Sequence, residues 1–317
     1  MKVKKKKAHN HNAVNSKLIR RPIQKKFWFF LMPMFLAFLI GFVWPFIFGI
    51  YLSFFKFLTV REIMTLDFSK IANNFVGFTN YFRAFQDPSF VRAFFYTALF
   101  TLVSVVVINV LAFFIAYFLT QNIKGTNIFR TVFFMPNLIG GIVLGYIWKL
   151  IFDGILSAYN TYLTANATFG FWGLVILMAW QQIGYMMIVY ISGFQSVSED
   201  IIEAAKIDGA TSTQTLFKVI IPNMMSSITI CTFLTLTNSF KLYDQNLSLT
   251  AGMPIVTENG VQTKMTEMLA LNITSSFNSQ GVYAKGTAQA KAVLFFIMVA
   301  IISIIQLNAT RSKEVQN

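Results

Sequence analysis

Long runs without a charged residue alternate with short charged segments along most of the chain. A helix needs about 20 predominantly apolar residues to cross a bilayer core, so each long run is a candidate membrane span. The predicted spans are residues 27–55, 93–120, 131–148 with an extension to 152, 171–196, 224–240 and 292–307. The pattern therefore predicts an all-α integral membrane protein with a six-span domain at 27–307, between tails at 1–26 and 308–317.

The composition agrees with a membrane protein and excludes an ordinary soluble domain. Apolar residues make up 56% of the 317 residues, and 36 of them are phenylalanine. Only 12% of the residues are charged, which is about half of the usual fraction in soluble domains. A soluble chain of this length would need far more polar surface.

The positive charge is concentrated at the N-terminus. The net charge is +14, and ten of the 26 basic residues lie within residues 1–26, where no acid accompanies them. A polybasic segment directly before an apolar span favours a cytoplasmic N-terminus, and six spans then return the C-terminus to the same side. The segment can also contact anionic lipid headgroups. An RNA-binding arm is disfavoured because the basic run lacks interleaved aromatic residues.

The predicted spans lack the groups that ion transport and catalysis require. Their cores contain no Asp, Glu or His, the nearest charge is Lys149, and both His9 and His11 lie in the N-terminal tail. Charged groups inside a membrane usually mark ion or proton routes, so a proton-coupled secondary transporter is disfavoured. The chain has no phosphate-binding Gly-x-x-x-x-Gly-Lys-Ser/Thr run. We therefore expect no metal, no cofactor and no enzyme activity.

The segment 198–222 breaks the charge rule for a cytoplasmic loop. The short loop at 121–130 carries two basic residues and no acid, as the rule requires. The segment at 198–222 instead carries two lysines and four acids, which are Glu199, Asp200, Glu203 and Asp208. We infer that this segment serves a purpose other than setting the topology.

Local signals in this segment predict a helix–turn–helix outside the bilayer. Ser198 is placed to cap the first helix, whose first turn holds acids that the helix dipole favours. Gly209 can end that helix in a left-handed conformation. Thr211 and Gln214 have the spacing of a capping box for a second short helix. Pro222 is then expected to separate this helix from the fifth span.

The same segment resembles the EAA loop of ABC-importer permeases. In that pattern Glu-Ala-Ala is followed after three residues by Gly, and after nine more by Ile-x-Leu-Pro. The residues that match are Glu203-Ala204-Ala205, Gly209 and Val219-Ile220-Ile221-Pro222, with Val219 and Ile221 as conservative departures. With Asp208, Ala210 and Phe217, the segment is similar to the carbohydrate subfamily, the maltose MalF-type permeases.

Other segments extend this resemblance over nearly the whole chain. They are Val76-Gly77-Phe78-Thr79-Asn80-Tyr81, Arg130-Thr131-Val132-Phe133-Phe134-Met135-Pro136 and Leu249-Thr250-Ala251-Gly252-Met253-Pro254. The resemblance implies the type I ABC importer permease fold with a cytoplasmic EAA coupling helix–turn–helix. The large extracellular insertion of the enteric maltose permease is absent, which leaves the compact six-span form.

The resemblance also implies a location and a set of partners. The location is the bacterial inner membrane, with both termini in the cytoplasm. The partners are a dimer of ATP-binding cassette subunits, a second homologous permease subunit, and an extracytoplasmic binding protein that delivers a carbohydrate. The EAA loop would couple the chain to the ATPase through Glu203, Ala204, Ala205, Asp208, Gly209, Phe217 and Pro222.

Polar residues in spans 4 and 5 are candidates for the substrate pathway. By counting from the Glu-Ala-Ala motif, positions that contact sugar in the maltose permease family correspond here to Gln181, Gln182, Tyr185, Thr235 and Ser239. Amides and hydroxyls suit a neutral polyol, but the same groups can form hydrogen bonds between helices. Both interpretations stay open, with the functional one favoured for Gln182 and Tyr185, whereas Asn109 and Lys149 are expected to be structural.

Three classes of function remain to be compared. A sugar importer permease explains the coupling loop, and an importer of glycerol phosphate or another polyol shares the same pattern. A secondary transporter predicts buried charges or inverted repeats, and a membrane-embedded enzyme predicts catalytic groups within the spans. The sequence favours a permease for a neutral oligosaccharide.

Overall fold

A computed structural model describes residues 27–56, 73–121, 124–258 and 261–311. The chain divides into two compact units, residues 1–52 and 53–317. In the first unit, one apolar helix runs over Phe27–Leu52 and contains a π-helical stretch, η1 (Leu39–Val43), before α2 (Trp44–Leu52). Because Pro45 has no N–H to donate, the regular hydrogen-bond ladder is interrupted here, which explains the wider turn.

The second unit is a bundle of long helices. They are α6 (Pro88–Leu119), α9 (Ala167–Gln195), α13 (Met225–Phe240) and α16 (Ala284–Arg311), preceded by the short α5 (Thr79–Gln86). Helix α9 lies at the centre, where Leu177, Met178 and Met186 are fully buried. Close packing substitutes here for the hydrophobic effect, which does not drive helices together within lipid.

The helices account for the predicted spans by length and composition. Among the described residues, four helices are long and apolar enough to cross a membrane, and the number rises to six if each of two bent helix pairs counts as one span. The four single helices cover Phe27–Leu52, Pro88–Leu119, Ala167–Gln195 and Ala284–Thr310. The bent pairs are Thr126–Leu138 with Gly141–Ser157, at 102°, and Ser212–Asn223 with Met225–Phe240, at 72°.

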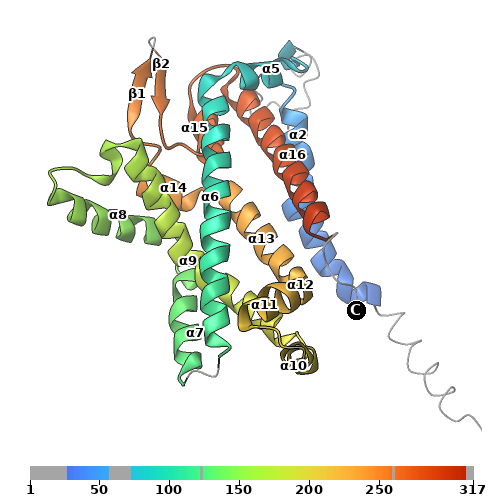
Figure 1. Ribbon diagram of the computed structural model, residues 1–317. Coiled ribbons are helices and arrows are strands. Elements are labelled where there is room, and N and C mark those ends of the chain that lie inside the picture. The colour runs from blue at the N-terminus through green and yellow to red at the C-terminus, as the bar shows by residue number, and fades with distance from the viewer. Residues whose placement is uncertain (1–26, 57–72, 122–123, 259–260, 312–317) are drawn as a thin grey trace, which may run out of the picture. The chain divides into compact units, whose positions relative to one another are not determined.

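The prediction of the third span as one continuous helix is wrong. Helix α7 (Thr126–Phe134) passes into a short 3-10 turn, η2 (Met135–Leu138), and the chain then bends into α8 (Gly141–Ser157). Ile139 and Gly140 are extended at the break. Figure 1 shows α8 lying crosswise to α9 instead of parallel to it. The apolar run at 131–152 therefore marks two helices of different direction.

Close packing holds α8 against α14 (Asp244–Leu249). A Cβ at Gly145 would collide with the side chain of Ser248, and a Cβ at Gly141 would lie 2.8 Å from Cδ of Gln245. The two glycines therefore allow an approach that larger residues would prevent.

The two ends of the bundle carry different small elements (Figure 1). At one end, called the hairpin end, lie α5, α15 (Leu269–Asn278) and an antiparallel hairpin of β1 (Ile255–Glu258) and β2 (Val261–Lys264), with Ile255 opposite Lys264. At the other, called the loop end, lie α10 (Glu199–Ile207), α11 (Ser212–Thr215), η4 (Leu216–Ile220) and α12 (Ile221–Asn223). A short 3-10 turn, η3 (Leu163–Ala165), precedes α9.

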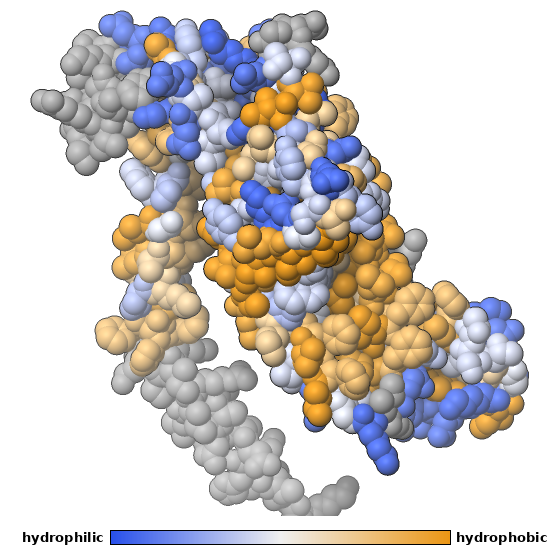
Figure 2. All heavy atoms as spheres, turned by 90° about the vertical axis from the view of Figure 1, so that its left-hand side faces the viewer, coloured by the Kyte–Doolittle hydropathy of each residue, from blue (hydrophilic) through white to orange (hydrophobic). Residues whose placement is uncertain are grey.

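The surface of the bundle suits a membrane. Figure 2 shows hydrophobic residues gathered over the middle of one face, with hydrophilic residues towards both ends. Large apolar side chains such as Phe95, Leu102 and Phe118 on α6 are more than half exposed. An apolar band of this kind suits contact with lipid tails, because they offer no hydrogen-bonding partner to polar groups.

The helix that contains the sixth predicted span begins before that span and carries a buried lysine. Helix α16 begins at Ala284, seven residues before Lys291, which was expected to mark the boundary of the span. Lys291 is only 1% exposed. The expectation that Lys149 is the charge nearest to the spans is therefore wrong, because burial with an acidic partner allows a lysine inside this helix.

Candidate functional site

The loop end contains the predicted helix–turn–helix. Helix α10 ends at Ile207, and Gly209 follows with φ of +81°, a left-handed conformation that glycine adopts without strain. The N–H of Ala210 donates to the carbonyl of Ala205 at 3.0 Å, which closes the turn. The backbone thus turns at Gly209, as the sequence predicted.

The second short helix begins with the predicted capping box. Thr211 Oγ1 accepts from the backbone N–H of Gln214 at 3.3 Å, and Gln214 Oε1 accepts from the N–H of Thr211 at 2.9 Å. Ser198 occupies the cap position of α10, but its side chain makes no capping hydrogen bond, so that part of the prediction is wrong. The turn between the helices is therefore better defined than the start of α10.

The bend into the fifth span comes at Met224, where the predicted span 224–240 begins, and not at Pro222 itself. Pro222 lies within the first turn of α12, where its missing N–H and fixed φ are tolerated. Met224 has φ of −101° and ψ of 16°, which interrupts the helix, and α13 leaves at 72° to the preceding helices. Residues 212–223 thus form one bent element with α13.

Most residues of the EAA motif lie on the surface. Glu203, Ala204, Asp208 and Gly209 are exposed, Ala205 is half-buried, and the described residues provide no ion pair to either acid. Two large apolar residues of the loop end are also exposed, Ile207 by 85% and Phe217 by 62%. The surface therefore combines free carboxylates with apolar side chains, a combination typical of a protein interface.

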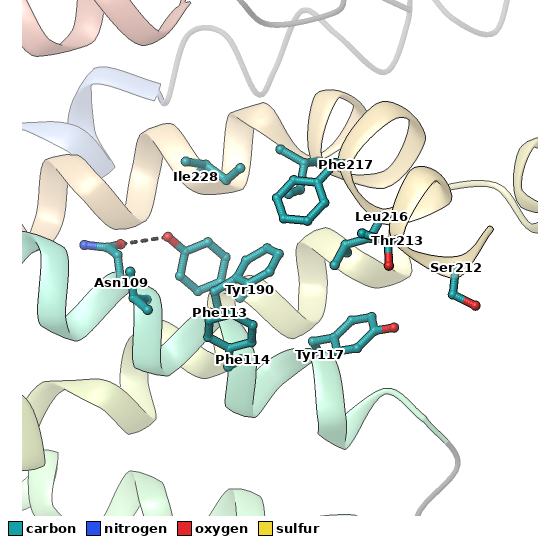
Figure 3. Close-up of a pocket in the computed structure, with 12 residues that line it drawn as sticks. Asn109, Phe113, Phe114, Tyr117, Tyr190, Ser212, Thr213, Leu216, Phe217 and Ile228 are labelled. Atoms are coloured by element: carbon teal, nitrogen blue, oxygen red, sulfur yellow. Dashed lines mark hydrogen bonds between the residues drawn. The ribbon is translucent and has the colours of Figure 1, made fainter. Parts of the chain in front are cut away.

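An apolar groove of about 600 Å³ joins the loop end to the bundle (Figure 3). Figure 3 shows Phe217 and Leu216 facing aromatic side chains of α6 across this groove, with Tyr190 of α9 at its inner side. The residues that line it are Asn109, Val110, Phe113, Phe114, Tyr117, Tyr190, Ser212, Thr213, Leu216, Phe217, Ile221 and Ile228. A displacement of the loop end would therefore change the surroundings of α6 and α9.

Two pairs of side-chain amides cross between helices in the middle of the bundle. Gln245 Nε2 of α14 donates to Gln181 Oε1 of α9 at 2.7 Å, and Asn238 Nδ2 of α13 donates to Gln182 Oε1 at 3.3 Å. Gln181 Nε2 also donates to the carbonyl of Ile139, at the break between η2 and α8, at 3.2 Å. The polar residues of span 4 therefore meet the break in span 3.

The predicted pathway residues differ in accessibility. Gln182 is half-buried, and Tyr185, one turn further along α9, is 37% exposed. Gln181 is buried, at 8% exposure. Thr235 and Ser239 are fully buried, and their hydroxyls donate to the carbonyls of Cys231 and Thr235 respectively. The structure thus brings Gln181, Gln182 and Tyr185 to neighbouring positions, and places the two hydroxyls within the helix packing.

Asn109 has the structural surroundings that we expected. Its Oδ1 accepts from Tyr190 OH at 2.7 Å, and its Nδ2 donates to the carbonyl of Val105 and to Thr235 Oγ1. These bonds join α6, α9 and α13 beside the groove of Figure 3.

A network of paired charges at the hairpin end, two of them buried, was not predicted from the sequence. Lys291 Nζ lies 2.6 Å from Asp87 Oδ2 and also donates to Asn272 Oδ1 and Ser276 Oγ. The Asn272 amide donates in turn to Glu267 Oε2 at 2.9 Å, and Glu267 pairs with Lys264 of β2. Two ammonium groups and two carboxylates therefore alternate through one hydrogen-bonded chain. The residues were visible in the sequence, but lie up to 204 positions apart.

Asp87 stands where this network reaches solvent. Burial raises the pKa of its carboxyl, but the hydrogen bond and the charge of Lys291, with two hydrogen bonds from Ser89, outweigh burial and lower the pKa below the ordinary 3.8. A pocket of about 310 Å³ opens beside the pair, and the ring of Tyr283 there packs against the guanidinium of Arg83 at 3.8 Å. The pair thus neutralises the charge of the buried Lys291.

The described residues contain no group of three or more metal-ligating side chains. The candidate site therefore consists of an exposed helix–turn–helix at one end and uncharged amide pairs in the middle. Such a site can bind a protein surface and hydrogen-bond a neutral polar molecule.

Comparison with known proteins places the chain in a family. Residues 108–313 match the family described as binding-protein-dependent transport system inner membrane component. The chain is 39% identical over 299 residues to a probable starch degradation products transport system permease protein, AmyD, of Thermoanaerobacterium thermosulfurigenes, which covers 92% of this chain and 95% of that protein. It is 30% identical to a multiple sugar-binding transport system permease protein, MsmF, of Streptococcus mutans, over 93% of this chain and 99% of that protein.

A solved structure has the same fold. It is a bacterial ABC transporter involved in the import of the acidic polysaccharide alginate, and its matching chain superimposes with a TM-score of 0.71 at 16% identity, over 93% of this chain and 98% of that chain. Taken with the exposed helix–turn–helix, these matches show that the chain belongs to the binding-protein-dependent transport system inner membrane components.

Proposed function

We propose that this chain is the permease subunit of an ATP-driven importer for a neutral oligosaccharide, with ATP hydrolysed by a separate subunit. The observation that carries the proposal is the exposed EAA helix–turn–helix, which stands at one end of an apolar bundle with uncharged amides in its middle. Sugar-transport permeases among the relatives support the choice of substrate.

The loop end is the docking surface for the ATPase subunit. The capping box of α11 and the closed turn at Gly209 hold its backbone through hydrogen bonds, so that it can transmit a displacement instead of absorbing it. Ile207 and Phe217 supply apolar contacts, and Glu203 and Asp208 supply carboxylates that have no ion-pair partner among the described residues. The loop end then faces the cytoplasm, and the hairpin end faces the binding protein outside.

Movement of the loop end reaches the pathway through α13. Residues 212–223 and α13 join at Met224, and Asn238 at the far part of α13 bonds to Gln182 of α9. Rotation of this bent element would alter the groove beside Phe217 and the amide pair together. In each of two positions of this bent element, the pathway then opens towards a different side of the membrane. A second, homologous permease closes the other side of the pathway.

The amide pairs suit a neutral sugar. Hydrogen bonds between helices in a membrane contribute only about 0.6 kcal/mol on average, so sugar hydroxyls can replace them at small cost. Tyr185 offers a partly exposed ring for stacking beside Gln182. Lys291, which is buried in α16, is already paired with Asp87 and so offers no free positive charge to a phosphate, which disfavours a phosphorylated substrate.

A matched pair of glycine variants tests the docking role. A Cβ would meet no atom within 4 Å at Gly209 or at Gly154, but only Gly209 has a positive φ. A left-handed conformation costs a non-glycine residue about 1–2 kcal/mol. In proteoliposomes that contain this chain, its partner permease and the ATPase, we expect Gly209→Ala to reduce ATP-dependent uptake of a maltooligosaccharide several-fold and Gly154→Ala to leave it unchanged.

Two results would contradict the proposal. Equal uptake by the two glycine variants would contradict the docking role of the turn. ATP-dependent uptake of glycerol phosphate, without uptake of any oligosaccharide that the binding protein delivers, would show that the substrate is glycerol phosphate and not an oligosaccharide.

A further inference from the structure

Gln245 lies at a junction that its sequence position does not indicate. It is the second residue of the short helix α14, beyond the end of the fifth span, and 64 residues separate it from Gln181, to which its amide donates. Gln181 in turn donates to the carbonyl of Ile139 at the break in the third span. Gln245 is thus connected to both helices that border this break.

The amide of Gln245 retains hydrogen-bonding capacity. A glutamine amide offers two N–H donors and an oxygen with two lone pairs. Gln245 uses one N–H in its bond to Gln181, and its Oε1 has no hydrogen-bond partner among the described residues. Gln245 is only half-buried, so that these groups can be reached. Gln181, by contrast, is buried and uses both ends of its amide.

Packing limits the positions that Gln245 can take. Its Cδ would lie 2.8 Å from a Cβ at Gly141, the first residue of α8, so the absence of a side chain there leaves room for the amide. Such a group, held in place but with a free donor and a free acceptor, fits two neighbouring hydroxyls of a sugar ring, which present an acceptor and a donor.

We propose that Gln245 is a specificity-determining residue that contacts hydroxyl groups of the sugar during transport, exchanging its hydrogen bond with Gln181 for bonds to a vicinal diol. This inference rests on the proposed function, because it assumes that a neutral oligosaccharide passes the amide pairs. It adds a residue from α14 to a pathway that sequence analysis placed on spans 4 and 5 alone.

The test compares an oligosaccharide with monodeoxy analogues that lack one hydroxyl each. The complete transporter is used in proteoliposomes, with the binding protein at saturating concentration and loaded with the parent sugar or with one analogue. A neutral hydrogen bond contributes enough for about a three- to tenfold difference in rate. We expect the wild type to transport one analogue three- to tenfold more slowly than the parent, and Gln245→Ala to reduce that ratio towards one.

Three further variants separate the possible outcomes. Gln245→Glu keeps the size of the side chain but removes the N–H donors, so it should lose the same discrimination even if Gln245→Ala fails to fold. Gln121→Ala, at an exposed position beyond α6, should keep the wild-type ratio. An unchanged ratio in both Gln245 variants, with an altered ratio in Gln182→Ala, would overturn this inference and leave the proposed function standing. Unchanged ratios in all three variants at the two pathway positions, Gln245 and Gln182, would overturn the pathway itself.

Discussion

The two ends of the bundle differ in whether their charged side chains have ion-pair partners within the chain. At the hairpin end, Lys291 and Asp87 form an ion pair, and Asn272 connects that pair to Glu267 and Lys264. At the loop end, the start of α11 is capped and the turn at Gly209 is closed, but Glu203 and Asp208 have no ion-pair partner among the described residues, and Ile207 is 85% exposed. One end pairs these four charged side chains within the chain, and the other leaves two carboxylates for a partner.

This difference separates stability from docking. A buried ion pair contributes little by its formation, but removal of one partner leaves an uncompensated charge, so the hairpin end is sensitive to single substitutions. An exposed surface contributes little to folding, and its substitutions act on binding instead. Variants at the two ends should therefore change different measurements.

The largest effect on stability is expected at Lys291. Lys291→Met leaves the partly exposed Asp87 without its cation and breaks the bonds to Asn272 and Ser276, which should lower the free energy of unfolding by about 3 kcal/mol. Denaturant unfolding in detergent measures this change. Lys241→Met is the matched control, because Lys241 is exposed and has no ion pair in the described structure. Equal stability of the two variants would contradict the claim that the ion pair at the hairpin end supports stability.

An intermediate effect is expected at Ile207, on binding alone. Ile207→Ala should weaken binding of the ATPase subunit about tenfold, as for an apolar residue at the centre of an interface, and should leave the unfolding midpoint unchanged. Affinity measurement with the purified ATPase checks the first part. Ile305→Ala, 62% exposed on α16, serves as the control that should leave the affinity unchanged. If Ile207→Ala lowered the stability without lowering the affinity, the loop end would serve folding and not docking.

The smallest effect is the pH dependence of the hairpin end. Asp87 has a pKa below 3.8 in the folded chain, so its contribution to stability is fully present at neutral pH and is lost as the pH falls below 3.8 through the folded pKa. The difference in thermal midpoint between the wild type and Asp87→Asn should therefore shrink between pH 7 and about pH 3. A difference that grows on acidification would contradict the ion pair as the source of stability.

The structure agrees with sequence analysis most closely where the signals are local. Apolar length predicted the helices at 88–119 and 167–195 within a few residues, and capping preferences predicted the turn at Gly209 and the box of Thr211 and Gln214. Analysis failed at the third span, because an apolar run measures length but not direction, and the bend at Ile139 and Gly140 changes only direction.

Lys291 shows why charge boundaries can mislead. A lysine ends a span when it must reach water, and that assumption placed the start of the sixth span at residue 292. The assumption fails here because Asp87, 204 residues earlier in the chain, lies within hydrogen-bonding distance. No local sequence pattern around Lys291 or Asp87 indicates that the two residues pair.

By itself, the sequence determined that the chain is a bundle of apolar helices with a helix–turn–helix at 198–222, because apolar length and capping act over neighbouring residues, and the resemblance to a known pattern identified that segment as an EAA loop. Only the tertiary structure decided which polar groups meet. It paired Gln181 with Gln245, Gln182 with Asn238 and Lys291 with Asp87, and it broke the third span beside the first of these pairs. The physical reason is that such pairings depend on the packing of helices far apart in the chain, which sets the distance between their side chains.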